Sequence, residues 1–148
     1  MKSKFNNVAH RDGFIYGLDD GILACLDLAT GQRRWKGGRY GHGQMLLVND
    51  LLLVITEKGN VALVEATPDA FKKIASVPAI EGRTWNNPAL AGPYLLVRNS
   101  EEAACFKLST CKNQVIEAAM TILTDFLNAI RWLRELFNRN LLEKPPPR

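Results

Sequence analysis

The feature that most constrains this chain is a repeat with a period of about 40 residues. Residues 15–27, IYGLDDGILACLD, align with residues 53–65, LVITEKGNVALVE, so that Gly21 matches Gly59. A third copy begins at residue 95 and carries the same strand-like apolar pattern. A fixed period decides the fold class, because every copy must form the same supersecondary unit.

Each copy has the pattern of a β-hairpin, in which an apolar strand, a polar turn and a second alternating strand follow one another. Gly21 and Gly59 end two of the turns and are expected to take positive φ, which glycine adopts without strain. A shorter strand is predicted before each hairpin, over residues 7–10, 44–49 and 88–91. A fourth strand is predicted after the first two hairpins, over residues 32–35 and 71–77.

Four strands in about 40 residues are typical of one blade of a β-propeller. We therefore predict a mostly β fold of about three antiparallel four-stranded blades, which form a partial propeller over residues 1–108. The predicted blades cover residues 5–36, 43–77 and 86–108. A propeller closes with about 4–8 blades, so three blades are not expected to close a ring.

Residues 25–35 read CLDLATGQRRW. They resemble the tryptophan-docking motif of PQQ-like β-propeller repeats, A-x-D-x-x-T-G-x-x-x-W, with a cysteine in place of the usual alanine. Asp27 and Thr30 are expected to hydrogen-bond the backbone of a tight turn that Gly31 relaxes. Trp35 is expected to pack between blades. In this family the motif is structural.

The resemblance to PQQ-like propellers covers residues 5–108, including GGRYGHGQ at 37–44 and GRTWNNPAL at 82–90. It implies a carboxyl-terminal fragment of a longer bacterial parent, or a truncated form. In relatives, the outer strand that the third blade lacks is commonly supplied by the beginning of the chain. The resemblance also implies a periplasmic or other extracytoplasmic location, although residues 1–10 have no apolar core of a secretory signal and the compartment stays open.

The tail, residues 109–148, resembles no family that we recognise. Over residues 113–141 the apolar period becomes about 3.5, which predicts one long amphipathic helix before the prolines at 145–147. Its apolar stripe must be buried against the open side of the propeller, an equivalent helix of another copy, or a membrane surface. The first of these is favoured. The predicted interface residues are Ile116, Leu123, Phe126, Ile130, Leu133 and Phe137.

Composition excludes several functional classes. Nineteen basic and 15 acidic residues give a net charge of +4 without a basic domain, so no nucleic-acid partner is expected. The apolar runs at residues 45–48 and 51–55 are too short for a transmembrane segment. Three cysteines without C-x-x-C spacing predict neither a disulfide framework nor a zinc site. Phosphate-loop, zinc-protease, serine-hydrolase and calcium-loop motifs are missing, so we predict no catalytic residue, metal or cofactor.

One loop is a candidate for facing a ligand near the propeller axis. His42 lies between two glycines, with Tyr40 and Gln44 beside it. A glycine-rich connection between blades is the favoured interpretation. Trp85 is interpreted as an inter-blade anchor, and stacking on a carbohydrate or a quinone is the alternative.

These observations favour a non-catalytic propeller module that acts as a protein-interaction scaffold. In this it would be similar to the propeller of the outer-membrane barrel-assembly lipoprotein. Its partner would be another protein or a second copy, held through the tail helix and the open blade edges. The alternative is a fragment of a PQQ- and calcium-dependent quinoprotein dehydrogenase.

Overall fold

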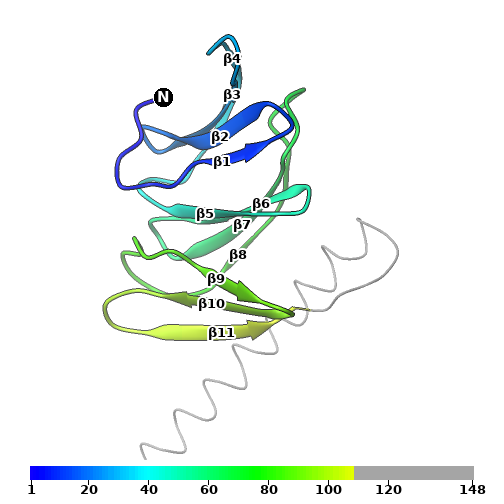
Figure 1. Cartoon of the computed structure of the whole chain (residues 1–148). Coiled ribbons are helices and arrows are strands. Elements are labelled where there is room, and N and C mark those ends of the chain that lie inside the picture. Colours follow the sequence, from blue (N-terminus) through cyan, green and yellow to red (C-terminus); the bar gives the residue numbers. More distant parts are fainter. Residues whose placement is uncertain (109–148) are drawn as a thin grey trace, which may run out of the picture.

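The computed structural model describes residues 1–108, which form three antiparallel sheets stacked one on another (Figure 1). We call these sheets blade 1, blade 2 and blade 3. Blade 1 holds β1 (Ala9–Arg11), β2 (Phe14–Asp19), β3 (Ile22–Asp27) and β4 (Arg33–Arg39). Blade 2 holds β5 (Gln44–Val48), β6 (Leu51–Ile55), β7 (Asn60–Glu65) and β8 (Lys73–Pro78). Blade 3 holds β9 (Ala89–Ala91), β10 (Tyr94–Arg98) and β11 (Ala103–Lys107).

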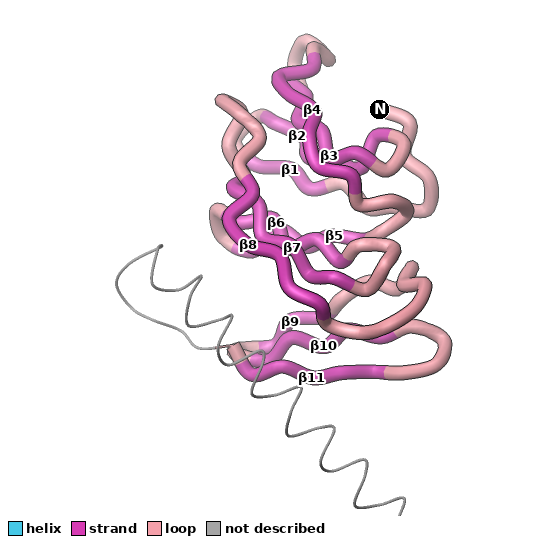
Figure 2. Tube along the Cα trace, turned by 180° about the vertical axis from the view of Figure 1, so that it is seen from behind, coloured by secondary structure: helices cyan, strands magenta, loops and turns pink. Residues whose placement is uncertain are grey.

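Within residues 1–108, the predicted β class and the blade-like sheets are confirmed. Each strand pairs with its neighbour in sequence, so every sheet is a simple meander. The first strands, β1, β5 and β9, lie along one side of the stack, and β4 and β8 lie along the other (Figures 1 and 2). Blade 3 has three strands within residues 1–108. The predicted tail helix and its interface residues lie outside the described residues.

The core consists of two layers, one on each side of blade 2. Leu52 and Val54 of β6 point toward blade 1, whereas Leu53 and Ile55 of the same strand point toward blade 3. Successive side chains of a strand point to opposite faces, and both faces of blade 2 are covered. The strand is therefore apolar at every position and does not alternate with polar residues.

The hairpin loops differ in length, which corrects the repeat alignment. In blade 1 the loop is Asp20 and Gly21, with φ of 52° and 79°. In blade 2 the N–H of Thr56 donates to the carbonyl of Asn60 at 2.7 Å, so the loop has one residue more. Strand pairing consequently matches Leu53 with Tyr16, not with Ile15 as the ungapped alignment has it.

The predicted fourth strand at residues 32–35 is too short. β4 continues through Gly37 and Gly38 to Arg39, over residues that the sequence places in a glycine-rich connection. The aromatic ring of Phe71 lies against Gly37, where an added Cβ would be 2.6 Å from its Cγ. Because Gly37 has no side chain, Phe71 of blade 2 can lie this close to β4.

Candidate functional site

The docking motif forms the turn between β3 and β4. One carboxylate oxygen of Asp27, Oδ1, accepts the backbone N–H groups of Ala29 and Thr30, both at 3.0 Å. The hydroxyl of Thr30 accepts the N–H of Gln32 at 3.3 Å, and Gly31 has a φ of 70°. The side chains of the motif thus satisfy backbone donors in a turn that needs positive φ.

Trp35 lies between blades 1 and 2. Its indole N–H donates to the carbonyl of Thr67 in blade 2 at 2.8 Å. Its ring lies 5.9 Å from that of Tyr16 and 5.8 Å from that of Phe71, in tilted and edge-on arrangements. These separations are typical of favourable aromatic pairs, so Trp35 joins the two blades by both packing and a hydrogen bond.

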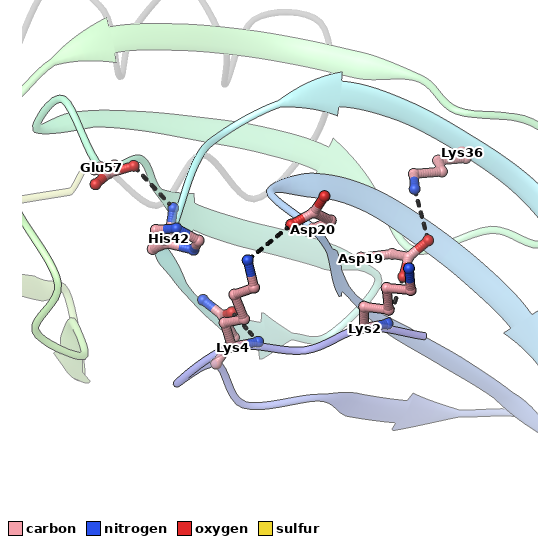
Figure 3. Close-up of polar contacts among 8 residues, drawn as sticks. Lys2, Lys4, Asp19, Asp20, Lys36, His42 and Glu57 are labelled. Carbon is pink, nitrogen blue, oxygen red and sulfur yellow. Dashed lines mark hydrogen bonds and ion pairs between the residues drawn. The ribbon is translucent and has the colours of Figure 1, made fainter.

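Three of the four candidate ligand-facing residues, Tyr40, His42 and Trp85, are hydrogen-bonded to Glu57, in the loop between β6 and β7. The Glu57 N–H donates to the carbonyl of Tyr40 at 2.9 Å. One carboxylate oxygen, Oε2, accepts the backbone N–H of His42 at 3.2 Å (Figure 3). The other, Oε1, accepts the indole N–H of Trp85 at 3.0 Å. We call Tyr40, His42, Gln44, Glu57 and Trp85 the linker junction, because they lie where the chain passes from one blade to the next.

Gln44 ties the same region together from the start of β5. Its side chain is 3% exposed, and its amide nitrogen donates to the carbonyls of Phe5 and Trp85, at 2.6 and 3.2 Å. Phe5 precedes blade 1 and Trp85 precedes blade 3, so one amide group joins the segments that enter all three blades. Within the described residues, Gln44 Oε1 and the Tyr40 hydroxyl are buried without a hydrogen-bond partner.

Hydrogen bonds favour the ionised form of Glu57. Donation from the His42 N–H, and then from the Trp85 indole, lowers the pKa of Glu57 below its ordinary value. The Arg83 guanidinium lies over the Trp85 ring, 5.0 Å from its centroid. The junction therefore contains an ionised carboxylate, each of whose two oxygens accepts a hydrogen bond from the chain itself. This arrangement suits holding linkers in place more than acid–base chemistry.

Sequence alone marks Glu57 only as a turn residue, and its role was missed. The signal that could have revealed it is the equivalent turn in the other blades. Asp19 of blade 1 accepts the backbone N–H of Lys2 and the ammonium of Lys36, the latter at 2.6 Å (Figure 3). Asn99 of blade 3 donates from its amide to the carbonyl of Glu81 at 2.6 Å. In every blade, a polar side chain at the hairpin turn binds the segment that leads into that blade.

A shallow apolar pocket lies away from the junction, between β5 and β9. It contains none of the candidate ligand-facing residues. Its lining residues are Leu46, Leu47, Val48, Asn49, Ala89 and Leu90. Residues 1–108 contain no cluster of three or more His, Cys, Asp or Glu side chains placed to hold a metal ion. None of these residues forms a helix of the length and apolarity needed to cross a membrane.

No protein-family model matches this chain, and no curated protein is significantly similar to it in sequence. Solved structures are similar. A crystal structure of a mitotic checkpoint complex aligns with a TM-score of 0.55 and 17% identity, over 65% of this chain and 33% of that chain. A quinohemoprotein alcohol dehydrogenase from Comamonas testosteroni aligns with a TM-score of 0.50 and 15% identity, over 62% of this chain and 16% of that chain.

A third structure, BamB from Moraxella catarrhalis, aligns with a TM-score of 0.47 and 19% identity, over 70% of this chain and 34% of that chain. This chain spans about a third or less of the length of these three proteins. At such low identity, the first two similarities show the fold alone, which is β-propeller-like.

Proposed function

We propose that this chain is a non-catalytic PQQ-like β-propeller module that acts as a protein-interaction scaffold. The observation that carries the proposal is the outer face of blade 3. Tyr94 and Leu96 are 48% and 44% exposed there. Strand pairing makes Tyr16 and Leu53 the equivalents of Leu96, and these are 1% and 4% exposed because the next blade covers each of them. Blade 3 thus presents a blade-packing surface that residues 1–108 leave uncovered.

The chemistry of this face suits another protein. Tyr94 and Leu96 supply an apolar centre, and Cys105 lies directly opposite Leu96. Arg98 and Lys107 are exposed at the ends of the same strands. Aromatic and apolar anchors with a charged rim are typical of protein interfaces. The positive charges favour a partner with acidic residues around an apolar patch.

The finer parts of the proposal rest on the sequence. The PQQ-like assignment rests on the motif at residues 25–35. The scaffold is a fragment or truncated form of a longer propeller, and residues 109–148, which begin two residues after the end of β11, serve as its capping or oligomerisation tail. The apolar stripe of that segment supports this role, because an amphipathic stripe is stable only when it is buried.

The proposal is tested by recovering partners with the full chain as bait. Leu96→Asp places a charge in the apolar centre of the face. Leu28→Asp is the matched control, because Leu28 is also exposed but lies in the turn after β3 of blade 1. We expect a partner that binds the wild type and the Leu28 variant and is lost with the Leu96 variant, while all three proteins have the same Tm. A partner that the Leu96 variant retains, or no specific partner at all, would overturn the proposal.

The non-catalytic part has its own test. A specific ligand stabilises the folded state that it binds, by about 2.7 kcal/mol at one hundred times its Kd. Adding PQQ together with calcium should leave the Tm of the full chain unchanged. A concentration-dependent rise in Tm would instead favour the quinoprotein alternative.

A further inference from the structure

The pocket between β5 and β9 lies at the interface between blades 2 and 3. It has a volume of about 560 Å³ and is open to solvent, a size typical of ligand sites. Within residues 1–108, β5 and β9 are edge strands of their sheets, on the same side of the stack (Figure 1). Leu46, Val48 and Leu90 give the pocket apolar walls, and Asn49 brings a polar side chain to it. The pocket therefore suits a ligand with an apolar stem and a polar end.

The repeat gives this pocket an equivalent between blades 1 and 2. Arg11, Val48 and Ala91 are the last residues of β1, β5 and β9, and a two-residue turn follows each of them. The first residue of the turn has a φ of 49° in blade 1 and of 54° in blades 2 and 3, so the three turns begin alike. Val48 therefore stands in blade 2 where Arg11 stands in blade 1.

Arg11 bridges the equivalent place between blades 1 and 2. Ala9, two residues earlier, packs against the core layer between these blades, so Arg11 starts on the face that blade 2 covers. Its Nη1 donates to the carbonyl of Asn49 in blade 2 at 3.2 Å, and its Nε donates to the carboxylate of Asp12 at 3.0 Å. Val48 has no polar group in its side chain and makes neither bond. Blade 2 thus lacks the guanidinium that bridges to the next blade from blade 1.

We propose that this pocket binds an arginine side chain of a partner protein. The proposal rests on the proposed function, because it needs a protein partner. The guanidinium of the ligand takes, between blades 2 and 3, the position that the guanidinium of Arg11 takes between blades 1 and 2. Its aliphatic stem packs on the apolar walls of the pocket, as the stems of long cationic side chains do on apolar surfaces. The side-chain amide of Asn49, which stands where blade 1 has Asp12, supplies an acceptor.

The charges at the pocket favour a guanidinium over other groups. Asp50, next to Asn49, is exposed, and its carboxylate attracts a cation. Arg11 also lies close to Asn49, but its charge is neutralised by Asp12. Arg11 makes its two bonds through different nitrogens of one planar group, which the compact ammonium of a lysine does not reproduce. An arginine ligand is therefore expected to bind more tightly than a lysine ligand.

The test titrates the full chain with the tripeptide Gly-Arg-Gly, blocked at both ends. Two control peptides carry lysine or norleucine in place of the arginine. Binding is followed by NMR, through the backbone amide signals of Asn49 and Leu90. We expect saturable shifts with the arginine peptide. Both control peptides should bind about tenfold more weakly or worse, because a hydrogen bond from a charged group is worth at least about this factor in affinity.

Two variants test the pocket itself. Val48→Arg supplies the occupant from the chain, so it should abolish binding of the arginine peptide. Its Tm should be at least that of Leu28→Arg, which adds the same charge at an exposed turn of blade 1. Asp50→Asn removes a charge beside the pocket without filling it. It should weaken binding by about twofold to fivefold, the usual worth of an exposed ion pair, and it serves as the test if Val48→Arg does not fold.

Several results would overturn the proposal. One is binding of the lysine or the norleucine peptide as tight as that of the arginine peptide. Another is the absence of any shift at Asn49 and Leu90, and a third is a folded Val48→Arg protein that still binds the arginine peptide. The proposed function is tested separately, because the Leu96→Asp variant should bind the arginine peptide as the wild type does. Loss of a partner at the face of blade 3 therefore leaves the result at the pocket unaffected.

Discussion

Replacing Gly59 by alanine should disturb the passage from blade 2 to blade 3. Gly59 ends the loop between β6 and β7 with a φ of 82°. Its carbonyl accepts the N–H groups of Ala79 and Ile80, at 3.0 and 3.1 Å. A Cβ added at Gly59 would lie 2.0 Å from the carbonyl oxygen of Ile80. The substitution therefore imposes both an unfavourable backbone conformation and a steric clash with the linker.

Gly13 separates these two effects. Its φ is 81°, almost the same as that of Gly59, but nothing lies within 4 Å of an added Cβ. Gly13→Ala should cost about 1–2 kcal/mol, the penalty of a left-handed conformation for a residue with a Cβ. Gly59→Ala should cost about 1–3 kcal/mol more, the typical price of overpacking. The gain from reducing the entropy of the unfolded chain applies to both variants and cancels in the comparison.

Urea unfolding of the full chain and the two variants measures both free energies of unfolding. We expect the Gly59 variant to be less stable than the Gly13 variant by at least about 1 kcal/mol, with equal m-values. Two variants of equal stability would show that the carbonyl of Ile80 moves aside freely. The linker would then not be held as tightly as its hydrogen bonds indicate.

Three further predictions concern single side chains. Trp35→Phe should lower the free energy of unfolding by about 1–3 kcal/mol, because the carbonyl of Thr67 loses its hydrogen-bond donor. An unchanged Tm would contradict this prediction. The pKa of Asp19 is lowered from 3.8 to about 2, mainly by the hydrogen bond from the backbone N–H of Lys2. The ionised Asp19 carboxylate therefore stabilises the folded protein fully above about pH 4, and this stabilisation is lost as the pH falls through 2. The Tm of the Asp19→Asn variant should therefore fall less than the Tm of the wild type when the pH is lowered from 5 to 2.5. Burial raises the pKa of the Cys25 thiol. A thiol reagent should therefore modify Cys25 only when urea unfolds the protein. Rapid modification of Cys25 in the folded protein would refute the burial of this side chain.

The sequence by itself determined the features that depend on neighbouring residues. The period of about 40 residues, the hairpins and the positive φ of Gly21 and Gly59 all follow from local alternation and turn chemistry. The turn of the docking motif is also local, because Asp27 and Thr30 bond backbone groups within three residues of themselves. Such interactions recur wherever the same short pattern occurs, so a pattern is enough to predict them.

Only the tertiary structure decided how the blades are joined. Glu57 binds His42 and Trp85, which lie 15 and 28 residues away, and no local pattern specifies these partners. The sequence marked both partners as candidates but gave no reason for them to meet at this carboxylate. The extension of β4 through Gly37 depends in the same way on Phe71, which approaches from the next blade. Contacts between blades depend on how the sheets stack, and sheet stacking depends on side chains from the whole repeat.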